Sequence, residues 1–333
     1  MKSVILGVGH YVPSKIVTNA DLAKLMETSD EWIQQRSGIR ERRYVEEGMG
    51  NTEMAFKATR MALERAKIDV KEIDLLILAT LSPDHTFPGT GCFVQEKLGL
   101  GGIPAIDIRQ QCSGFIYGVS IADQFIRAGT YRTVLVIGTE VQSTGLDFST
   151  RGRDVTILFG DGAGAVVMRA SHAASENRGI LSTHLHADGR YAKELWVEGP
   201  SSREHPRVSQ RMLDEGTWYP RMNGRAVFTM AVKKMQEAVQ EALAANDIRN
   251  IEDVDLFVFH QANIRIVQAL CEQLRISMEK TYNNIHKYGN TTAASIPIAL
   301  SEAVQEERLK ENDLLCIAAF GSGFTWASAL IRW

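Results

Sequence analysis

Short apolar runs rich in β-branched residues alternate along this chain with longer segments of helical periodicity. Each run is almost continuously apolar, as expected of a strand that other layers cover on both faces. The alternation predicts an α/β protein whose strands are mostly parallel. The clearest runs are residues 75–77, 134–137, 165–168, 256–259 and 314–318.

Part of this pattern occurs twice. Residues 71–77 (KEIDLLI) parallel residues 252–258 (EDVDLFV), and residues 133–137 (TVLVI) parallel residues 313–317 (DLLCI). The two offsets, 181 and 180 residues, are almost the same, which favours duplicated halves over a string of unrelated βα units. We place the halves at 1–170 and 171–333, with the second beginning in the polar stretch 171–178.

One segment, residues 191–223, breaks the rhythm. It holds Pro200, Pro206 and Pro220, paired serines and scattered aromatic residues without sustained periodicity. We predict an extended structured loop here, and loops of this length in compact domains are often functional.

The composition is that of a globular protein, with 44% hydrophobic and 23% charged residues among 333. A net charge of −3 leaves no basic footprint, so we exclude nucleic acid as a partner. No apolar run reaches the roughly 18 to 20 residues that span a bilayer, and residues 1–9 lack the features of a signal peptide. We therefore expect a cytoplasmic protein that does not bind membranes.

Four cysteines, Cys92, Cys112, Cys271 and Cys316, stand far apart without a C-x-x-C pair, which excludes a zinc site and a disulfide framework. Cys112 follows an apolar strand pattern and a small-residue turn and precedes a helical pattern over 116–128. A cysteine at a helix N-terminus is favoured as thiolate, so Cys112 is the candidate nucleophile. The alternative for Cys112, and our prediction for the other three, is a buried small hydrophobe.

Two further residues carry candidate chemistry. His260 ends the strand pattern 256–259, at the edge where α/β proteins place their ligand crevices. Asn290 lies at a loop-to-helix junction and could equally be a helix cap. The glycine-rich segment 160–164 runs into a β-branched stretch instead of opening a helix, which excludes a dinucleotide-binding fingerprint.

Four motifs in order, QCSGF (111–115), FHQAN (259–263), GNTTAAS (289–295) and FGSGFTWASAL (320–330), together with FGDGAGA (159–165), resemble the β-ketoacyl-acyl carrier protein synthase III family. The resemblance covers nearly the whole chain. It implies a thiolase fold of five αβαβα layers with two similar halves, a homodimer, no cofactor, and coenzyme A thioesters as substrates.

The resemblance also implies a reaction. Cys112 attacks an acyl-CoA primer to form an acyl-enzyme, and His260 with Asn290 stabilises the enolate formed when malonyl-acyl carrier protein loses carbon dioxide. The carbanion attacks the acyl-cysteine and gives a 3-oxoacyl-acyl carrier protein, a step of fatty acid biosynthesis. Backbone N–H groups of Cys112 and Ser322 would form a second oxyanion hole.

Three sets of binding residues follow from the same resemblance. In the first, Trp32 and Arg151 sandwich the adenine of coenzyme A and Arg36 meets phosphate, although Trp32 taken alone resembles a helix-packing residue. The full coenzyme A set is Thr28, Trp32, Arg36, Arg151, Gly152, Phe228 and Asn263. The acyl pocket would comprise Phe87 from the partner subunit, Gln142 and Phe320. Carrier-protein docking would use Arg225, Lys233, Lys234 and Arg265.

The sequence departs from the family pattern at three places. Ser322 replaces a glycine, which puts only its backbone conformation in question. Gln110 and Gln111 replace small residues before the nucleophile, and Thr229 stands where the family often has a docking lysine.

Other functions are possible within and beyond this fold. Related condensing enzymes use the same three residues to make quinolones, long-chain ketones or polyketides. A papain-like hydrolase shares the order Cys, His, Asn but not the surroundings of Cys112, and a non-catalytic scaffold would not need all three residues. We further hypothesise that residues 191–223 reshape the acyl entrance for a medium or longer primer, the alternative being a surface anchor or dimer contact.

Overall fold

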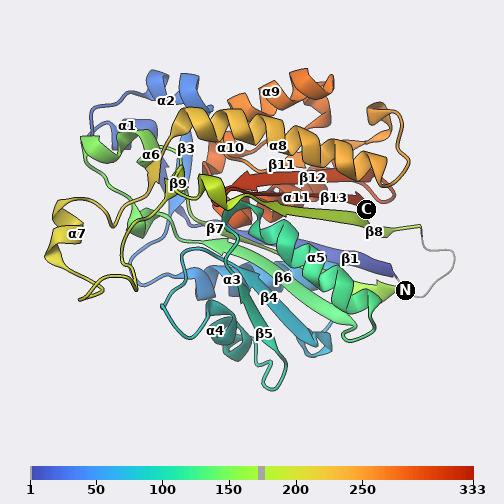
Figure 1. Cartoon of the computed structure of the whole chain (residues 1–333). Helices are drawn as coiled ribbons and strands as arrows, with labels where there is room; N and C mark the ends of the chain where they lie inside the picture. The colour runs from blue at the N-terminus through green and yellow to red at the C-terminus, as the bar shows by residue number, and fades with distance from the viewer. Residues whose placement is uncertain (1, 172–176) are drawn as a thin grey trace.

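The computed structural model describes residues 2–171 and 177–333, which form two β-sheets with helices between and outside them (Figure 1). The first sheet has the strand order β1-β7-β6-β4-β5 and the second the order β11-β12-β13-β8. The strands of the first sheet are β1 (Lys2–Tyr11), β4 (Leu75–Ala79), β5 (Ala105–Ile108), β6 (Thr133–Glu140) and β7 (Gly162–Ser171). Those of the second are β8 (Gly179–Ala187), β11 (Leu256–Phe259), β12 (Leu314–Gly321) and β13 (Thr325–Arg332).

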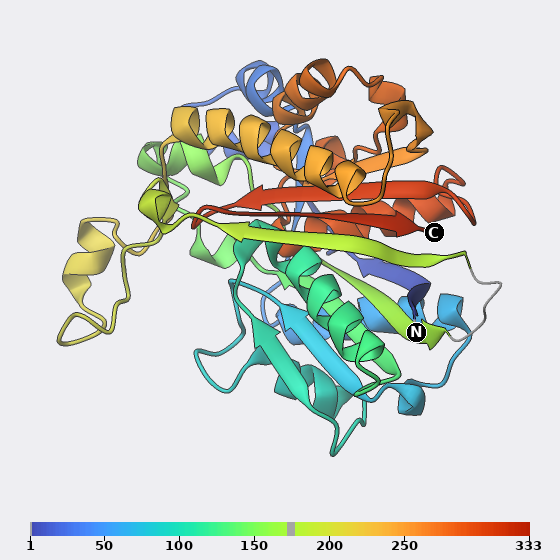
Figure 2. The ribbon, with the colours of Figure 1, turned by 45° about the vertical axis from the view of Figure 1, so that its right-hand side comes forward.

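Helices cover both faces of each sheet. Between the sheets lie α5 (Gly114–Arg127) and α11 (Ser295–Gln305), below the first sheet lie α3 (Asn51–Ala66) and α4 (Thr90–Lys97), and above the second lie α8 (Gly224–Ala244) and α9 (Ile264–Leu274). Figure 2 shows the same layers in a view turned by 45° about the vertical axis. The arrangement is the five-layered αβαβα order that the resemblance implied.

The apolar strands alternate between the layers that they touch. In β4, Leu75 and Ile77 pack into the central core with α5 and α11, while Leu76 and Leu78 pack against α3 and α4. Because both faces are buried, the strand shows no polar positions, which is why its sequence is a continuous apolar run.

Shorter elements complete the chain. The strands β2 (Lys15–Thr18) and β3 (Glu41–Tyr44) pair with each other, as do β9 (Leu195–Trp196) and β10 (Arg221–Met222). The remaining α-helices are α1 (Asn19–Leu22), α2 (Asp30–Ser37), α6 (Arg153–Thr156), α7 (Gln210–Asp214) and α10 (Ile285–Tyr288). Two single 3-10 turns matter for the site, Gln111–Ser113 before α5 and Thr292–Ala294 before α11.

The repeated sequences occupy equivalent places in the two sheets. β4 pairs with β6 in parallel with Leu75 opposite Val134, and β11 pairs with β12 in parallel with Leu256 opposite Leu315. Leu315 lies one residue beyond Leu314, which the sequence match pairs with Val134, so the match of residues 133–137 with 313–317 is shifted by one residue from the structural equivalence. Asp74 and Asp255 each precede the first strand and accept backbone N–H bonds from the start of its neighbour. The division into halves stays a prediction, and residues 172–176 of the proposed boundary lie outside the described residues.

Two expectations need correction. The sheets are mixed, but β1–β7, β6–β7, β12–β13 and β8–β13 are antiparallel, so parallel pairs do not dominate. The tight turn between β12 and β13 can join only antiparallel strands. Cys92 is exposed on α4, whereas Cys271 and Cys316 are buried as predicted.

The segment 191–223 contains more structure than a loop. β9 and β10 close its base, and α7 stands away from the body of the molecule (Figures 1 and 2). The side chain of Met212 on α7 is buried within the segment, while Val208 and Leu213 are exposed.

Candidate active site

Cys112 lies at the turn that leads from β5 into α5. The preceding residue, Gln111, has φ of 45°, a left-handed conformation that costs a residue with a side chain roughly 1 kcal/mol or more. The helix starts at Gly114, whose ideal Cβ would lie 3.0 Å from the Ala79 side chain. Close packing at Gly114 and the strained turn together hold Cys112 at the N-terminal end of α5.

The Cys112 thiol is buried, with 7% of the residue exposed. Burial raises the pKa of the thiol to about 12, the charge of Glu140 acts in the same direction, and the backbone N–H groups of Cys112 and Ser322 oppose both. The expectation that the helix N-terminus favours a thiolate is therefore corrected, because desolvation outweighs the donors in the unliganded site.

His260 follows β11, and its backbone N–H donates to Ala318 of β12 at 2.9 Å. Burial lowers the pKa of the imidazole to about 3, so the ring is neutral at pH 7. Its Nδ1 lies 2.7 Å from Ser295 Oγ. Ser295 Oγ also accepts from the backbone N–H of Gln261 at 3.4 Å. We assign the serine proton to the bond with Nδ1, and this assignment places the ring proton on Nε2.

In the described part of the chain, His260 Nε2 is buried without a hydrogen-bond partner. Asn290 presents a second donor, because its Oδ1 accepts from the Thr292 N–H at 2.9 Å and the opposite end of the amide is its Nδ2. Asn290 is fixed by its backbone, which bonds to Leu158 and Gly160. The N-cap position of the turn Thr292–Ala294 belongs to Thr291, so Asn290 is not its N-cap residue.

One cavity of about 480 Å³ is lined by Cys112, His260 and Asn290 together. Its wall continues through Phe320 and Gly321 at the end of β12 and Phe228 on α8. A nucleophile and two neutral donors in one cavity suit chemistry in which a thioester carries an acyl group and negative charge develops on oxygen.

The turn after β12 completes the surroundings of the nucleophile. A Cβ at Gly321 would lie 2.8 Å from Cys112 Cβ and 3.2 Å from its Sγ, so only glycine fits there. Ser322 keeps a negative φ, which a serine adopts without strain, while Gly323 has φ of 131°. The departure from the family glycine at Ser322 therefore leaves its backbone donor in place.

Trp32 on α2 lines the same cavity and is flanked by two guanidinium groups. Arg36 Cζ lies 4.4 Å from the centre of the indole ring and Arg153 Cζ 5.1 Å from it. Arg153 is held by a bond from Nη1 to the Glu27 carbonyl at 2.9 Å. Sequence reasoning missed Arg153, although a second arginine two residues beyond Arg151 was a visible signal.

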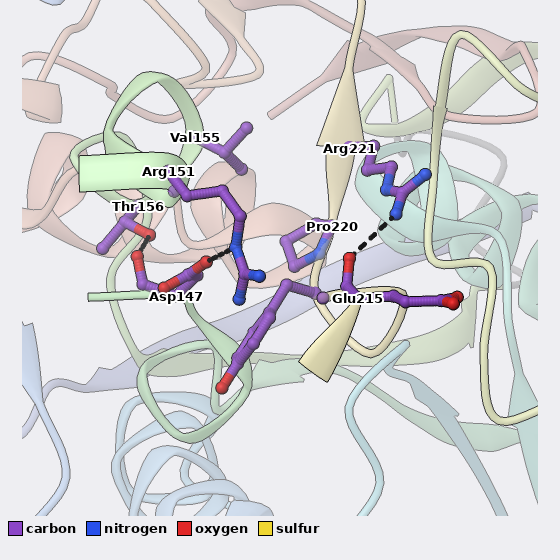
Figure 3. A pocket seen from close by; sticks show the side chains of 10 residues that line it. Asp147, Arg151, Val155, Thr156, Glu215, Pro220 and Arg221 are labelled. Atoms are coloured by element: carbon purple, nitrogen blue, oxygen red, sulfur yellow. Dashed lines mark hydrogen bonds and ion pairs between the residues drawn. The ribbon is translucent and has the colours of Figure 1, made fainter. Parts of the chain in front are cut away.

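The predicted sandwich partner, Arg151, lies in a different cavity of about 280 Å³, shown in Figure 3. Its Nε is paired with Asp147 at 2.6 Å, and its guanidinium lies 5.6 Å from the Tyr219 ring. Gly152 lines that cavity too, where a Cβ would lie 2.1 Å from the Asp147 carbonyl. The structure thus does not bring Arg151 to Trp32.

Of the other predicted coenzyme A residues, two line the cavity of Cys112 and one does not. Phe228 and Asn263 line the cavity of Cys112, and Asn263 also connects α2 to α9 by donating to the Arg36 carbonyl at 2.8 Å. Thr28 does not line the cavity, and its hydroxyl is buried without a hydrogen-bond partner among the described residues.

Of the three predicted acyl-pocket residues, only one lines the cavity. Phe320 lines the cavity, whereas Gln142 turns away and donates to Thr292 Oγ1 at 2.9 Å. Phe87 is 83% exposed on a loop of the same subunit and is not among the residues that line the cavity.

Of the predicted docking residues, Arg225 and Arg265 line the cavity with exposed side chains. Lys233 and Lys234 lie further along α8, and Lys234 is engaged with Glu237 at 2.7 Å and with the Trp326 ring. From the segment 191–223, only Leu195 and Met222 line the cavity.

No helix among residues 2–171 and 177–333 is long and apolar enough to cross a membrane. The same residues contain no group of three or more His, Cys, Asp or Glu placed to hold a metal ion.

Comparison with known proteins matches two family models to the chain. They are 3-oxoacyl-[acyl-carrier-protein (ACP)] synthase III, over residues 106–189, and 3-oxoacyl-[acyl-carrier-protein (ACP)] synthase III C terminal, over residues 243–333. Beta-ketoacyl-[acyl-carrier-protein] synthase III of Alkalilimnicola ehrlichii is 47% identical over 331 residues, covering 99% of this chain and 98% of the relative.

Two solved structures share the fold over the full length. The 3-oxoacyl-[acyl-carrier-protein] synthase III of Aquifex aeolicus has a TM-score of 0.90 at 43% identity, covering 99% of this chain and 100% of its own. The synthase III of Thermus thermophilus has a TM-score of 0.90 at 40% identity, covering 99% of both chains. The expected fold class is confirmed by these structures.

Proposed function

This chain belongs to the β-ketoacyl-acyl carrier protein synthase III family, and from that premise we propose how its residues divide the reaction. The enzyme is an acyltransferase that joins an acyl-CoA primer to malonyl-acyl carrier protein by decarboxylating condensation, in fatty acid biosynthesis. The related condensing enzymes of secondary metabolism are not favoured by these relatives. The observation that carries the assignment of roles is the single cavity shared by Cys112, His260 and Asn290.

In the first step, the Cys112 sulfur attacks the thioester carbon of the primer, and coenzyme A leaves as the thiol with the cysteine proton. The Cys112 and Ser322 N–H groups, which already face the sulfur, would hold the thioester oxygen of the acyl-enzyme. In the second step, His260 Nε2–H and Asn290 Nδ2–H donate to the malonyl thioester oxygen as carbon dioxide departs. A neutral His260 suits this role, because it donates without becoming acidic.

Coenzyme A would bind along the wall that leads from Cys112 to Trp32. We assign the stack on Trp32 to the adenine, with Arg36 and Arg153 as the cationic neighbours in place of Arg151. The exposed Arg225 and Arg265 at the cavity would meet the acidic carrier protein.

We also propose a cytoplasmic homodimer that needs no cofactor. The exposed Phe87 supports the dimer, since an aromatic side chain that is 83% exposed on a loop is unusual unless a partner covers it. A partner's Phe87 would then close the acyl end of the cavity. Light scattering tests this, and full activity in a monomer would refute it.

The assignment of roles is tested by measuring the steps separately. Cys112→Ala should not gain an acyl mass from acyl-CoA, whereas His260→Ala and Asn290→Ala should be acylated but should lose decarboxylation of malonyl-acyl carrier protein. Cys271→Ala, which removes another buried thiol, is the matched control and should be acylated normally. Stable acylation of Cys112→Ala at the wild-type rate would contradict the assignment.

Primer length remains our hypothesis from the sequence. Leu195 and Met222 give the segment 191–223 two apolar contacts with the cavity, which supports some influence on the primer. Each buried methylene contributes about 0.8 kcal/mol, so a longer pocket would favour octanoyl-CoA over acetyl-CoA. Competition between the two for acylation of Cys112 tests this, and an acetyl preference in kcat/KM would end the hypothesis.

A further inference from the structure

The proposed decarboxylation needs two donors from different parts of the chain to point at the same oxygen atom. His260 follows β11, whereas Asn290 lies between α10 and the turn Thr292–Ala294. A misplacement of about 1 Å between such groups can cost roughly 100-fold in rate, because the donors must be in place before the charge develops. Any contact that fixes the two segments relative to each other therefore acts on this step.

The side chain of Gln261 joins the two segments by four hydrogen bonds. Its Nε2 donates to the Phe259 carbonyl at 2.8 Å and to the Tyr282 carbonyl at 3.3 Å. Its Oε1 accepts from the backbone N–H groups of Asn284 at 3.0 Å and Ile285 at 3.2 Å. Both hydrogens and both acceptor positions of the amide are thus used.

An amide is the side-chain group that matches these four partners. All of them are backbone groups, so their polarity determines which end of the Gln261 amide is the oxygen. A carboxyl group of the same shape has at most one donor for the two carbonyl groups. Gln261 is 1% exposed and does not line the cavity, whereas its neighbours His260 and Ala262 do. Gln261 can therefore act on the reaction only through the residues that it holds.

The short helix α10 connects the Gln261 amide to Asn290. Asn284 is the N-cap residue of α10, but its own side chain makes no capping bond. The Gln261 Oε1 supplies the capping oxygen instead, to the N–H groups of Asn284 and Ile285. At the other end of this single turn, the Gly289 N–H donates to the Ile285 carbonyl at 2.9 Å, and Asn290 follows directly. The position of the Gln261 amide is thus transmitted to Asn290 through one helical turn.

The remaining contacts of Gln261 surround His260. The bond from Gln261 Nε2 to the Phe259 carbonyl connects the residues on either side of the histidine. The Gln261 backbone N–H donates to Ser295 Oγ at 3.4 Å, and the same oxygen lies 2.7 Å from His260 Nδ1. One residue therefore contacts both the surroundings of the imidazole and the segment that carries Asn290.

We infer that Gln261 is a positioning residue that sets the separation of the two decarboxylation donors. Its amide connects the end of β11 to the start of α10, so that His260 Nε2 and Asn290 Nδ2 face one oxygen atom. This role rests on the proposed function, because it belongs to the step in which those two donors act. Acylation of Cys112 uses neither donor and does not depend on Gln261.

Gln261→Glu tests this role, because it keeps the shape of the side chain and removes at least one donor. Acylation by acyl-CoA, followed by intact mass, should change less than twofold, whereas release of carbon dioxide from malonyl-acyl carrier protein should fall roughly 10- to 100-fold. Asn51→Asp is the matched control. Asn51 is 0% exposed, donates to the Ser82 carbonyl, accepts from Thr139 Oγ1 at 2.9 Å and does not line the cavity. Its replacement should not separate the two rates.

A second readout asks whether Gln261 acts through the donors. In an Asn290→Ala background, Gln261→Glu should lower the residual release of carbon dioxide less than twofold further, because one of the two donors is already absent. A merely structural role would lower the rate by the same factor in both backgrounds, and that result would overturn the inference.

Two other results also overturn it: wild-type release of carbon dioxide by Gln261→Glu, and equal losses in acylation and decarboxylation. If Gln261→Glu does not fold, Gln261→Asn takes its place, since it keeps the amide but shortens its reach by one methylene. The same separation of rates is expected, and the same results would refute it. A wild-type enzyme that is acylated but releases no carbon dioxide would instead refute the proposed function.

Discussion

Removing the Ser295 hydroxyl should separate the two steps of the reaction. Ser295 Oγ lies 2.7 Å from His260 Nδ1 in a buried position, and we argued that its proton keeps the imidazole proton on Nε2. In Ser295→Ala the Nδ1 atom loses this partner, and the tautomer without a donor on Nε2 becomes accessible. Decarboxylation then depends on Asn290 alone in a fraction of the molecules.

The size of the effect follows from the geometry. A buried hydrogen bond of normal length that loses one partner costs about 1–3 kcal/mol in stability. If about 1–2 kcal/mol of this appears in the transition state for decarboxylation, the rate falls roughly 5- to 30-fold. Acylation of Cys112 does not use the Nε2 proton and should change less than twofold.

The assay measures acylation by intact mass and release of carbon dioxide from malonyl-acyl carrier protein on the same preparations. Ser328→Ala is the matched control, because Ser328 is equally buried and donates to the Ala238 carbonyl at 2.7 Å, away from the site. Ser328→Ala should lower the free energy of unfolding by a similar amount without lowering the rate of decarboxylation. Equal losses in both steps of Ser295→Ala, or an unchanged rate of decarboxylation, would refute the tautomer argument.

Three further predictions follow. Arg153→Ala should raise the KM for acyl-CoA roughly tenfold, whereas Arg151→Ala should change it less than twofold; equal effects would contradict our placement of the adenine. Gly321→Ala should lower the free energy of unfolding by about 1–3 kcal/mol and slow the acylation of Cys112. The control is Gly145→Ala, whose Cβ would meet no other atom, and it should change neither quantity; urea unfolding and acylation assays measure the two. Because the pKa of Glu140 is raised from 4.5 to about 7, its contribution to stability is complete below pH 4.5 and is lost as pH rises through 7. Urea unfolding at pH 4.5 and 8 should show wild type losing about 3 kcal/mol relative to Glu140→Gln, and parallel curves would contradict the shift.

The sequence predicted those parts of the molecule that depend on local pattern. The buried strands, the helix after Cys112 and the place of His260 at a strand end follow from periodicity and motif order. The choice between Arg151 and Arg153 did not, because the two flank Gly152 and only the turn into α6 decides which guanidinium faces Trp32.

Contacts that depend on the order of strands in a sheet could not be predicted from the sequence either. Ser82 and Glu140 are 58 residues apart and meet only because β4 and β6 are neighbours in the sheet. The pKa of Cys112 was misjudged for a related reason: the helix N-terminus is visible in the sequence, but the depth of burial is the product of the whole fold.

The glycine turn against Cys112 has a consequence for how the thiol is protected during the life of the protein. Gly321 and Ser322, which cover the sulfur, belong to the hairpin of β12 and β13, and they are synthesised some 200 residues after the cysteine. A nascent chain therefore carries an uncovered thiol until these two strands have paired. In the folded enzyme, oxidants should reach this sulfur faster whenever the β12–β13 hairpin opens, so the rate of sulfenic acid formation at Cys112 becomes a measure of local unfolding there.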